Sequence, residues 1–113
     1  MNDCLFCKII AGEIPSTQIY EDEWVYAFLD IDPQAPFHAV IVPKIHIASA
    51  TEITAENSHY ISKIFEAVAK IAQKENLEDG FRVVNNCGKD GGQTVGHIHF
   101  HLLARRNLQW PPG

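Results

Sequence analysis

Apolar and polar residues alternate along several short segments of the chain, and this pattern predicts β-strands. From His97 to Leu102, every second residue is apolar and the residues between are histidines. Other segments are near-continuous runs of apolar, aromatic and β-branched residues, which are typical of strands covered on both faces. Five main strands are therefore predicted, over residues 18–21, 24–29, 38–43, 81–85 and 97–103.

Apolar residues that recur three or four positions apart predict two helices. A short one is expected over residues 4–10 with Asp3 as N-cap, and a long one over about residues 54–75 with Thr54 as N-cap. The apolar stripe of the long helix contains Ile61, Ile64, Phe65, Val68, Ile71 and Ala72. One long helix among sequence-adjacent strands favours an α+β fold with an antiparallel meander sheet of about five strands. A chain of 113 residues is expected to form one domain, residues 1–113.

Composition narrows the range of partners. The 9 basic and 14 acidic residues give a formal charge of −5, which disfavours a nucleic-acid surface but leaves single-nucleotide binding open. No apolar run reaches the length of a membrane span, and residues 1–4 have neither the basic nor the apolar part of a signal peptide. We therefore expect a cytoplasmic protein that does not bind membranes.

The histidine-rich segment is the first candidate for chemistry. On a strand, His97, His99 and His101 share one face, and the apolar residues between them enter the core. Imidazoles serve as metal ligands or as acid, base and nucleophile near neutral pH. A single catalytic zinc bound by all three is disfavoured, because same-face positions at 97 and 101 are roughly 13 Å apart.

The loop of residues 86–96 precedes these histidines and contains Gly88, Gly91, Gly92 and Gly96. Glycines expose backbone N–H groups that can surround an anion, and Thr94 adds a hydroxyl donor. Glycine-rich loops are more often simple turns, but the position beside three imidazoles favours a phosphate cradle next to a nucleophile.

The sequence from His97 to Leu103, His-φ-His-φ-His-φ-φ with φ apolar, resembles the defining motif of the histidine-triad (HIT) superfamily. Further segments resemble its nucleotide-binding Hint branch along nearly the full length: residues 8–10, 13–15, 33–36, 42–44, 90–95 and 110–113. The resemblance implies a HIT-like fold and a homodimer whose sheets continue across the subunit contact. It also implies a purine nucleoside phosphoramidase that cleaves the P–N bond of substrates such as adenosine 5′-phosphoramidate, with AMP or GMP as a nucleotide ligand and no organic cofactor.

The same resemblance implies roles for three histidines. His99 resembles the nucleophile that attacks the α-phosphorus and forms a nucleotidyl-histidine intermediate, which water then resolves. His101 is expected to hydrogen-bond a non-bridging phosphate oxygen. His38 resembles a fourth family histidine that helps set the protonation of the triad.

Further positions match the family's nucleotide contacts. Asn86, Gly92 and Thr94 match phosphate-contacting positions, and Asp30 matches the carboxylate that accepts from both ribose hydroxyls. The walls around the base are matched by apolar residues, for which plain core packing remains an alternative: Phe6, Ile9, Ile14, Phe28 and Ile31.

Cys4 and Cys7 form a Cys-x-x-Cys pair, and two thiolates at this spacing can fill half of a tetrahedral zinc site. His46 and His97 are candidates for the other two ligands, and this set resembles a zinc-binding bacterial subset of the superfamily. Four protein ligands leave no open position, so we expect one structural zinc per chain. A pair of buried thiols or a redox pair are the alternatives, and Cys87 is expected to be uninvolved.

Other functions remain open from sequence. A nucleotide-binding or scaffolding protein with incidental hydrolysis would have the same residues. A diadenosine polyphosphate hydrolase is a further alternative, although that branch lacks a tail like residues 110–113. The uridylyltransferase branch, which has glutamine at the third histidine, is disfavoured by His101.

Overall fold

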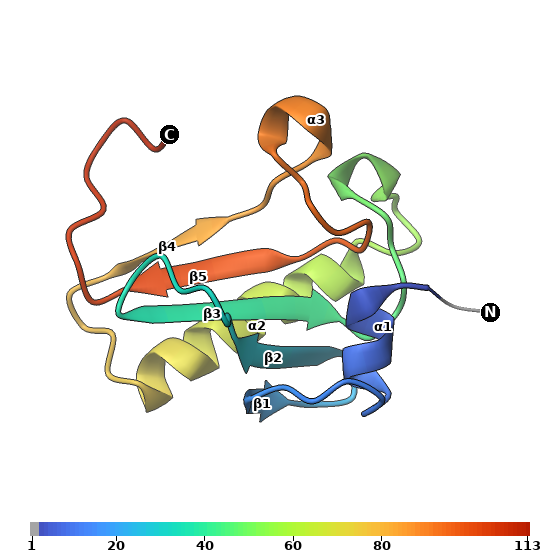
Figure 1. Ribbon diagram of the computed structural model, residues 1–113, viewed down its shortest axis with the longest axis horizontal. Coiled ribbons are helices and arrows are strands. Elements are labelled where there is room, and N and C mark those ends of the chain that lie inside the picture. The colour runs from blue at the N-terminus through green and yellow to red at the C-terminus, as the bar shows by residue number, and fades with distance from the viewer. Residues whose placement is uncertain (1–2) are drawn as a thin grey trace.

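The computed structural model describes residues 3–113, so Met1 and Asn2, part of the segment in which no signal peptide is expected, lie outside it. Within this range the chain forms a five-stranded antiparallel sheet with one long helix (Figure 1). The strands are β1 (Gln18–Glu21), β2 (Val25–Leu29), β3 (Phe37–Pro43), β4 (Phe81–Val84) and β5 (Phe100–Ala104). The expected α+β class, the antiparallel sheet and the short N-terminal helix are confirmed.

The strand order is β1-β2-β3-β5-β4, which departs from a simple meander. The long helix α2 (His59–Lys74) carries the chain from β3 to β4, and β5 then returns to fill the place between them. In the β3–β5 ladder, Val40 faces His101 and Ala39 faces Leu102. This order places β5, which follows His97 and His99, inside the sheet and β4 at one edge.

Each face of the sheet carries its own apolar cluster. One cluster includes Ile41 and Leu102 from the sheet and Ile98 from the segment before β5, and it lies against Ile64 and Ile71 of α2. The other packs Tyr26, Phe28, Val40 and Val42 against Phe6 and Ile9 of α1 (Leu5–Ile10). Figure 1 shows α2 behind the sheet and α1 at its front, near the end of β3. Every residue of β3 is therefore buried, which explains its nearly unbroken apolar sequence.

Two expected helix starts are wrong. The long helix begins at His59 after Ser58 and not at Thr54, because residues 54–58 form a turn that Asn57 closes by accepting from the Thr54 amide at 2.7 Å. Cys4, not Asp3, is the N-cap of α1, and its Sγ accepts from the Cys7 amide at 3.4 Å. A short 3-10 helix, η1 (Ala50–Glu52), precedes the turn.

The regular strand β5 begins at Phe100, three residues later than expected. The preceding residues are nevertheless extended enough to keep the alternation, because Ile98, Phe100 and Leu102 all enter the cluster on the α2 side. The glycine-rich loop contains a four-residue helix, α3 (Gly88–Gly91), that the sequence did not indicate. No helix in the described range has the length and apolar character needed to cross a membrane.

Candidate active site and metal centre

His99 lies at the centre of the site and is almost fully buried, with 3% of its surface exposed. Its Nδ1 is 2.8 Å from the carbonyl oxygen of His97, a group that only accepts, so Nδ1 carries the proton. In a neutral imidazole the other nitrogen, Nε2, then holds the lone pair. The backbone thus selects the tautomer in which Nε2 of His99 is available as a nucleophile.

His38 and His101 are joined by a hydrogen bond between neighbouring strands. The amide of Gln34 donates to Nδ1 of His38 at 3.0 Å, so neutral His38 carries its proton on Nε2. That Nε2 lies 2.8 Å from Nδ1 of His101 and 3.4 Å from Oδ2 of Asp30. His101 therefore accepts at Nδ1 and keeps its own proton on Nε2, where it can donate a hydrogen bond.

Burial keeps these imidazoles uncharged. Desolvation, with smaller contributions from His99 and His38, lowers the pKa of His101 to about 4. Desolvation also lowers the pKa of His38, against the opposing effects of Asp30 and Asp32. Both groups are neutral near pH 7, as the hydrogen-bond chain requires.

Asn85 was not singled out by the sequence, which indicated only a strand end. Its Nδ2 donates to the carbonyl oxygen of His99 at 2.9 Å. The backbone of His99 is therefore held from β4's end, while its ring is held by His97. An amide side chain after a strand gives no signal of such a long-range contact.

Gln93 was missed as well, and it organises the glycine-rich loop. Its side-chain oxygen accepts from the Gly88 amide at 3.1 Å, and its Nε2 donates to the carbonyls of Ala48 and Val95 at 2.8 and 2.9 Å. Of the expected phosphate contacts on or near this loop, Asn86 is half-buried, whereas Gly92 and Thr94 are exposed.

The apolar residues matched to base contacts differ in burial. Phe6, Ile9 and Phe28 are buried in the α1-side cluster, and Ile14 packs against it. Phe6 also lies edge-on to His99, with ring centroids 5.0 Å apart. Ile31 is fully exposed at 100% and belongs to neither cluster, while Asp30 beside it is half-buried.

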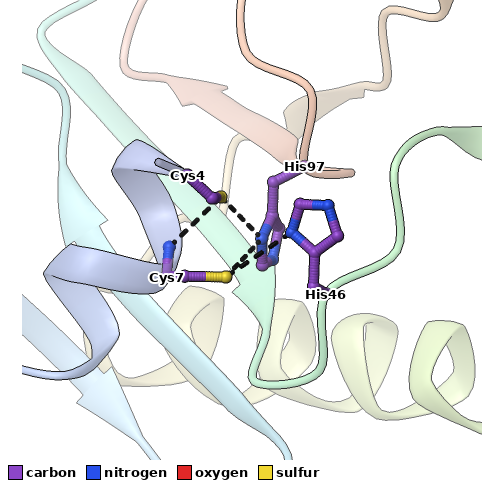
Figure 2. Close-up of side chains that lie close together, drawn as sticks. All are labelled: Cys4, Cys7, His46 and His97. Carbon is purple, nitrogen blue, oxygen red and sulfur yellow. Dashed lines mark hydrogen bonds between the residues drawn. The ribbon is translucent and has the colours of Figure 1, made fainter. Parts of the chain in front are cut away.

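A second cluster brings together Cys4, Cys7, His46 and His97 (Figure 2). Their ligand atoms all lie within 4.8 Å of one another, although they come from α1, the loop after β3 and the segment before β5. Nδ1 of His97 is 3.3 Å from Cys4 Sγ and 3.5 Å from Cys7 Sγ, and Nδ1 of His46 is 3.5 Å from Cys7 Sγ.

These separations fit a tetrahedral ion. With Zn–S near 2.3 Å and Zn–N near 2.1 Å, a tetrahedral zinc separates sulfur and nitrogen ligands by roughly 3.6 Å. Nε2 of His97 donates to the Pro43 carbonyl at 3.0 Å, which leaves the lone pair on Nδ1, facing the thiols. Burial lowers the pKa of His97 to about 4, so this imidazole is in the neutral form that binds metals. Zinc held here would supply a fixed tetrahedral centre that joins the three chain segments.

The chain is similar over most of its length to a known domain and to known proteins. The sequence model of the HIT domain matches residues 11–108. A 14 kDa zinc-binding protein from Zea mays is 51% identical over 114 residues, covering 96% of this chain and 87% of the relative. The purine nucleoside phosphoramidase of Escherichia coli K12 is 45% identical over 107 residues, covering 94% and 90%.

A solved structure gives the same fold. The crystal structure of a HIT family hydrolase from Legionella pneumophila superposes with a TM-score of 0.95 at 49% identity, covering 98% of this chain and all of that one. Together with the domain match over most of the sequence, these relatives show that the chain belongs to the HIT domain family.

Proposed function

We propose that this protein is a purine nucleoside phosphoramidase that hydrolyses nucleoside 5′-phosphoramidates such as adenosine 5′-monophosphoramidate. The observation that supports this most directly is the hydrogen bond from His99 Nδ1 to the His97 carbonyl, which leaves Nε2 as a neutral nucleophile. A relative by sequence, the purine nucleoside phosphoramidase of Escherichia coli, supports the proposal that the bond hydrolysed is a P–N bond.

The reaction proceeds in two displacements. Nε2 of His99 attacks the α-phosphorus, the P–N bond breaks, and the amine departs with a proton from the medium. His101 donates from Nε2 to a non-bridging oxygen and stabilises the charge that develops there. Water then cleaves the nucleotidyl-histidine bond, releasing the nucleoside monophosphate and restoring the imidazole.

The remaining nucleotide contacts are proposed by position. Asp30 accepts from the ribose hydroxyls, and Asn86, Gly92 and Thr94 donate to phosphate. Among the residues matched to base contacts, Ile31 is the most exposed, whereas Phe6, Ile9, Ile14 and Phe28 belong to the packed cluster on the α1 side.

Three further properties complete the proposal. One structural zinc per chain is bound by Cys4, Cys7, His46 and His97, supported by their ligand spacing. The protein is a homodimer, supported by the edge position of β4 and by large exposed apolar side chains on β4 and α2, Phe81 and Phe65. We also propose that it works in the cytoplasm.

Covalent trapping tests the function. Protein is mixed with adenosine 5′-phosphoramidate, quenched within the first turnover and examined by intact mass spectrometry for an added AMP. Wild type is expected to gain the adduct and turn over, while His99→Ala gains none. His59→Ala is the matched control, because His59 is an exposed histidine on α2. A wild type with neither adduct nor turnover contradicts the proposal, and retained nucleotide binding would then favour the scaffolding alternative.

A further inference from the structure

His97 belongs to both clusters at once. Its side chain faces the two thiols of the metal centre, at 3.3 and 3.5 Å. Its carbonyl oxygen accepts the hydrogen bond from Nδ1 of His99, at 2.8 Å. Any shift of the His97 residue therefore moves the acceptor that selects the tautomer and the ring orientation of His99.

The segment that carries these groups is held by few backbone contacts. The β3–β5 ladder extends only to the pair Ile41–Phe100, so residues 97–99 precede the regular pairing. The amide of Ile98 donates to the carbonyl of Ile47, next to the candidate ligand His46, at 2.6 Å. Metal bound by His46 and His97 would therefore fix both ends of this contact.

A second route runs through Phe6. This residue lies between Cys4 and Cys7 on α1, and its ring is edge-on to both His97 and His99, with centroids 5.9 and 5.0 Å away. Helix α1 has only six residues, too few for a helix to be stable without tertiary contacts. Its position relative to His99 therefore depends on the ligand cysteines and on the packing of its buried side.

We infer that the Cys4–Cys7–His46–His97 centre controls the geometry of the nucleophile, with the His97 carbonyl and the Phe6 ring as the two positioning groups. Occupied, the centre holds His99 in the Nδ1–H tautomer with Nε2 available. Vacated, it releases residues 97–99 and α1, and His99 samples both tautomers while the rest of the sheet persists. The kinetic part of this inference rests on the proposed phosphoramidase; the structural part does not.

The first test compares zinc-loaded with chelator-treated wild type, without substrate. Imidazole ¹⁵N NMR reports the His99 tautomer, and amide hydrogen exchange reports residues 97–100. We expect one tautomer with zinc, a mixture without it, and at least tenfold faster exchange at Ile98 and His99, with α2 protection unchanged. The same tautomer and the same exchange in both states would overturn the inference.

The Phe6→Leu variant keeps the test decisive even where chelation unfolds the chain, because it retains all four ligands. We expect it to bind zinc as wild type does, yet to show a mixed His99 tautomer. Adduct formation in a single turnover should slow at least tenfold, with less than a threefold change in KM. Leu5→Ala, on the exposed side of α1, is the matched control and should behave as wild type. A zinc-loaded Phe6→Leu protein with wild-type tautomer and adduct rate removes the Phe6 route.

Failure of the two proposals can be told apart. If zinc-loaded wild type forms no adduct, the phosphoramidase fails, and the tautomer and exchange measurements still decide the positioning inference. If wild type forms the adduct equally fast with and without zinc while folded, the positioning inference fails and the enzyme remains.

Discussion

Nε2 of His38 lies 2.8 Å from Nδ1 of His101, so two imidazoles on adjacent strands share one hydrogen bond. Because the Gln34 amide donates to the other nitrogen of His38, the proton in this bond comes from His38. The orientation leaves His101 as a donor at Nε2.

Replacing His38 tests that orientation. His38→Phe removes the donor that selects the His101 tautomer, so we expect kcat on adenosine 5′-phosphoramidate to fall by about 10²-fold, within the usual range for a group that places a proton. Steady-state kinetics measure the effect, with His59→Phe as the control on α2. An unchanged kcat in a folded His38→Phe protein would mean that His101 needs no such partner.

Acidification is expected to destabilise the fold through the neutral imidazoles. The pKa of His101 is lowered to about 4 by burial, whereas an unfolded histidine binds its proton near pH 6.5. Between about pH 6.5 and pH 4 the unfolded chain holds more protons, so the free energy of unfolding falls as the pH decreases.

Urea denaturation at pH 7 and pH 5 measures this loss. His101→Asn should lose less stability than wild type over the same interval, by on the order of 1–2 kcal/mol. Comparing two zinc-loaded proteins cancels the acid sensitivity of the metal centre. An equal loss of unfolding free energy in both proteins would show that protonation of His101 does not cause the acid destabilisation.

Elemental analysis of purified protein should find about one zinc per chain. Cys7→Ser is expected to lower this ratio below one-half and to reduce Tm by at least about 5 °C, because the bound metal joins α1 to the segments at His46 and His97. Cys87→Ser, at a half-buried cysteine outside the cluster, is the control and should keep its zinc. Metal-free wild type of equal stability would exclude a structural role.

Two glycines of the loop are expected to respond differently to alanine. Gly92 has φ of +73°, a left-handed conformation that costs an alanine about 1 kcal/mol or more. Gly96 has no left-handed φ, and a Cβ there would meet no atom within 4 Å, so Gly96→Ala should change stability by less than about 0.5 kcal/mol. Thermal unfolding of the two variants measures the difference in stability. Equal stabilities of Gly92→Ala and Gly96→Ala would show that the loop changes its backbone conformation to accept the alanine at position 92.

The homodimer proposal predicts a two-subunit mass in sedimentation velocity at micromolar concentration. Phe65, half exposed on α2, and Phe81, 43% exposed on β4, are the large apolar side chains expected in the contact. Phe65→Glu should weaken association at least tenfold, since it places a charge in an apolar interface. Ile45→Glu, at an exposed isoleucine in the loop after β3, is the control. A monomeric wild type would contradict the proposal.

Local patterns in the sequence were enough to predict much of this structure. The alternation around His99 and the Cys4–Cys7 spacing are properties of neighbouring residues, so they indicated a shared face and a thiol pair correctly. The place of β5 between β3 and β4 depends on long-range packing and departed from the expected meander. The helix start at Thr54 was wrong because Asn57 closes a turn there, in competition with helix formation.

The roles of Asn85 and Gln93 could not be predicted for a similar reason. Each acts by a side-chain hydrogen bond to a carbonyl distant in sequence, His99 for the first and Ala48 for the second. For Ile31 the sequence left both a base contact and core packing open, and its full exposure excludes core packing. Side-chain contacts between segments distant in the sequence could therefore be identified only from the three-dimensional structure.

The long helix α2 packs on one face of the sheet, whereas the rings of His97 and His99 contact Phe6 of the cluster on the other face. An engineer can therefore treat the two layers independently. Stabilising substitutions and attachment points for labels or surfaces belong on the helix layer, at solvent-facing positions other than Phe65. Changes of substrate preference belong on the opposite layer. There the short helix α1 and the glycine-rich loop can be redesigned while the apolar cluster between the sheet and α2 stays unchanged.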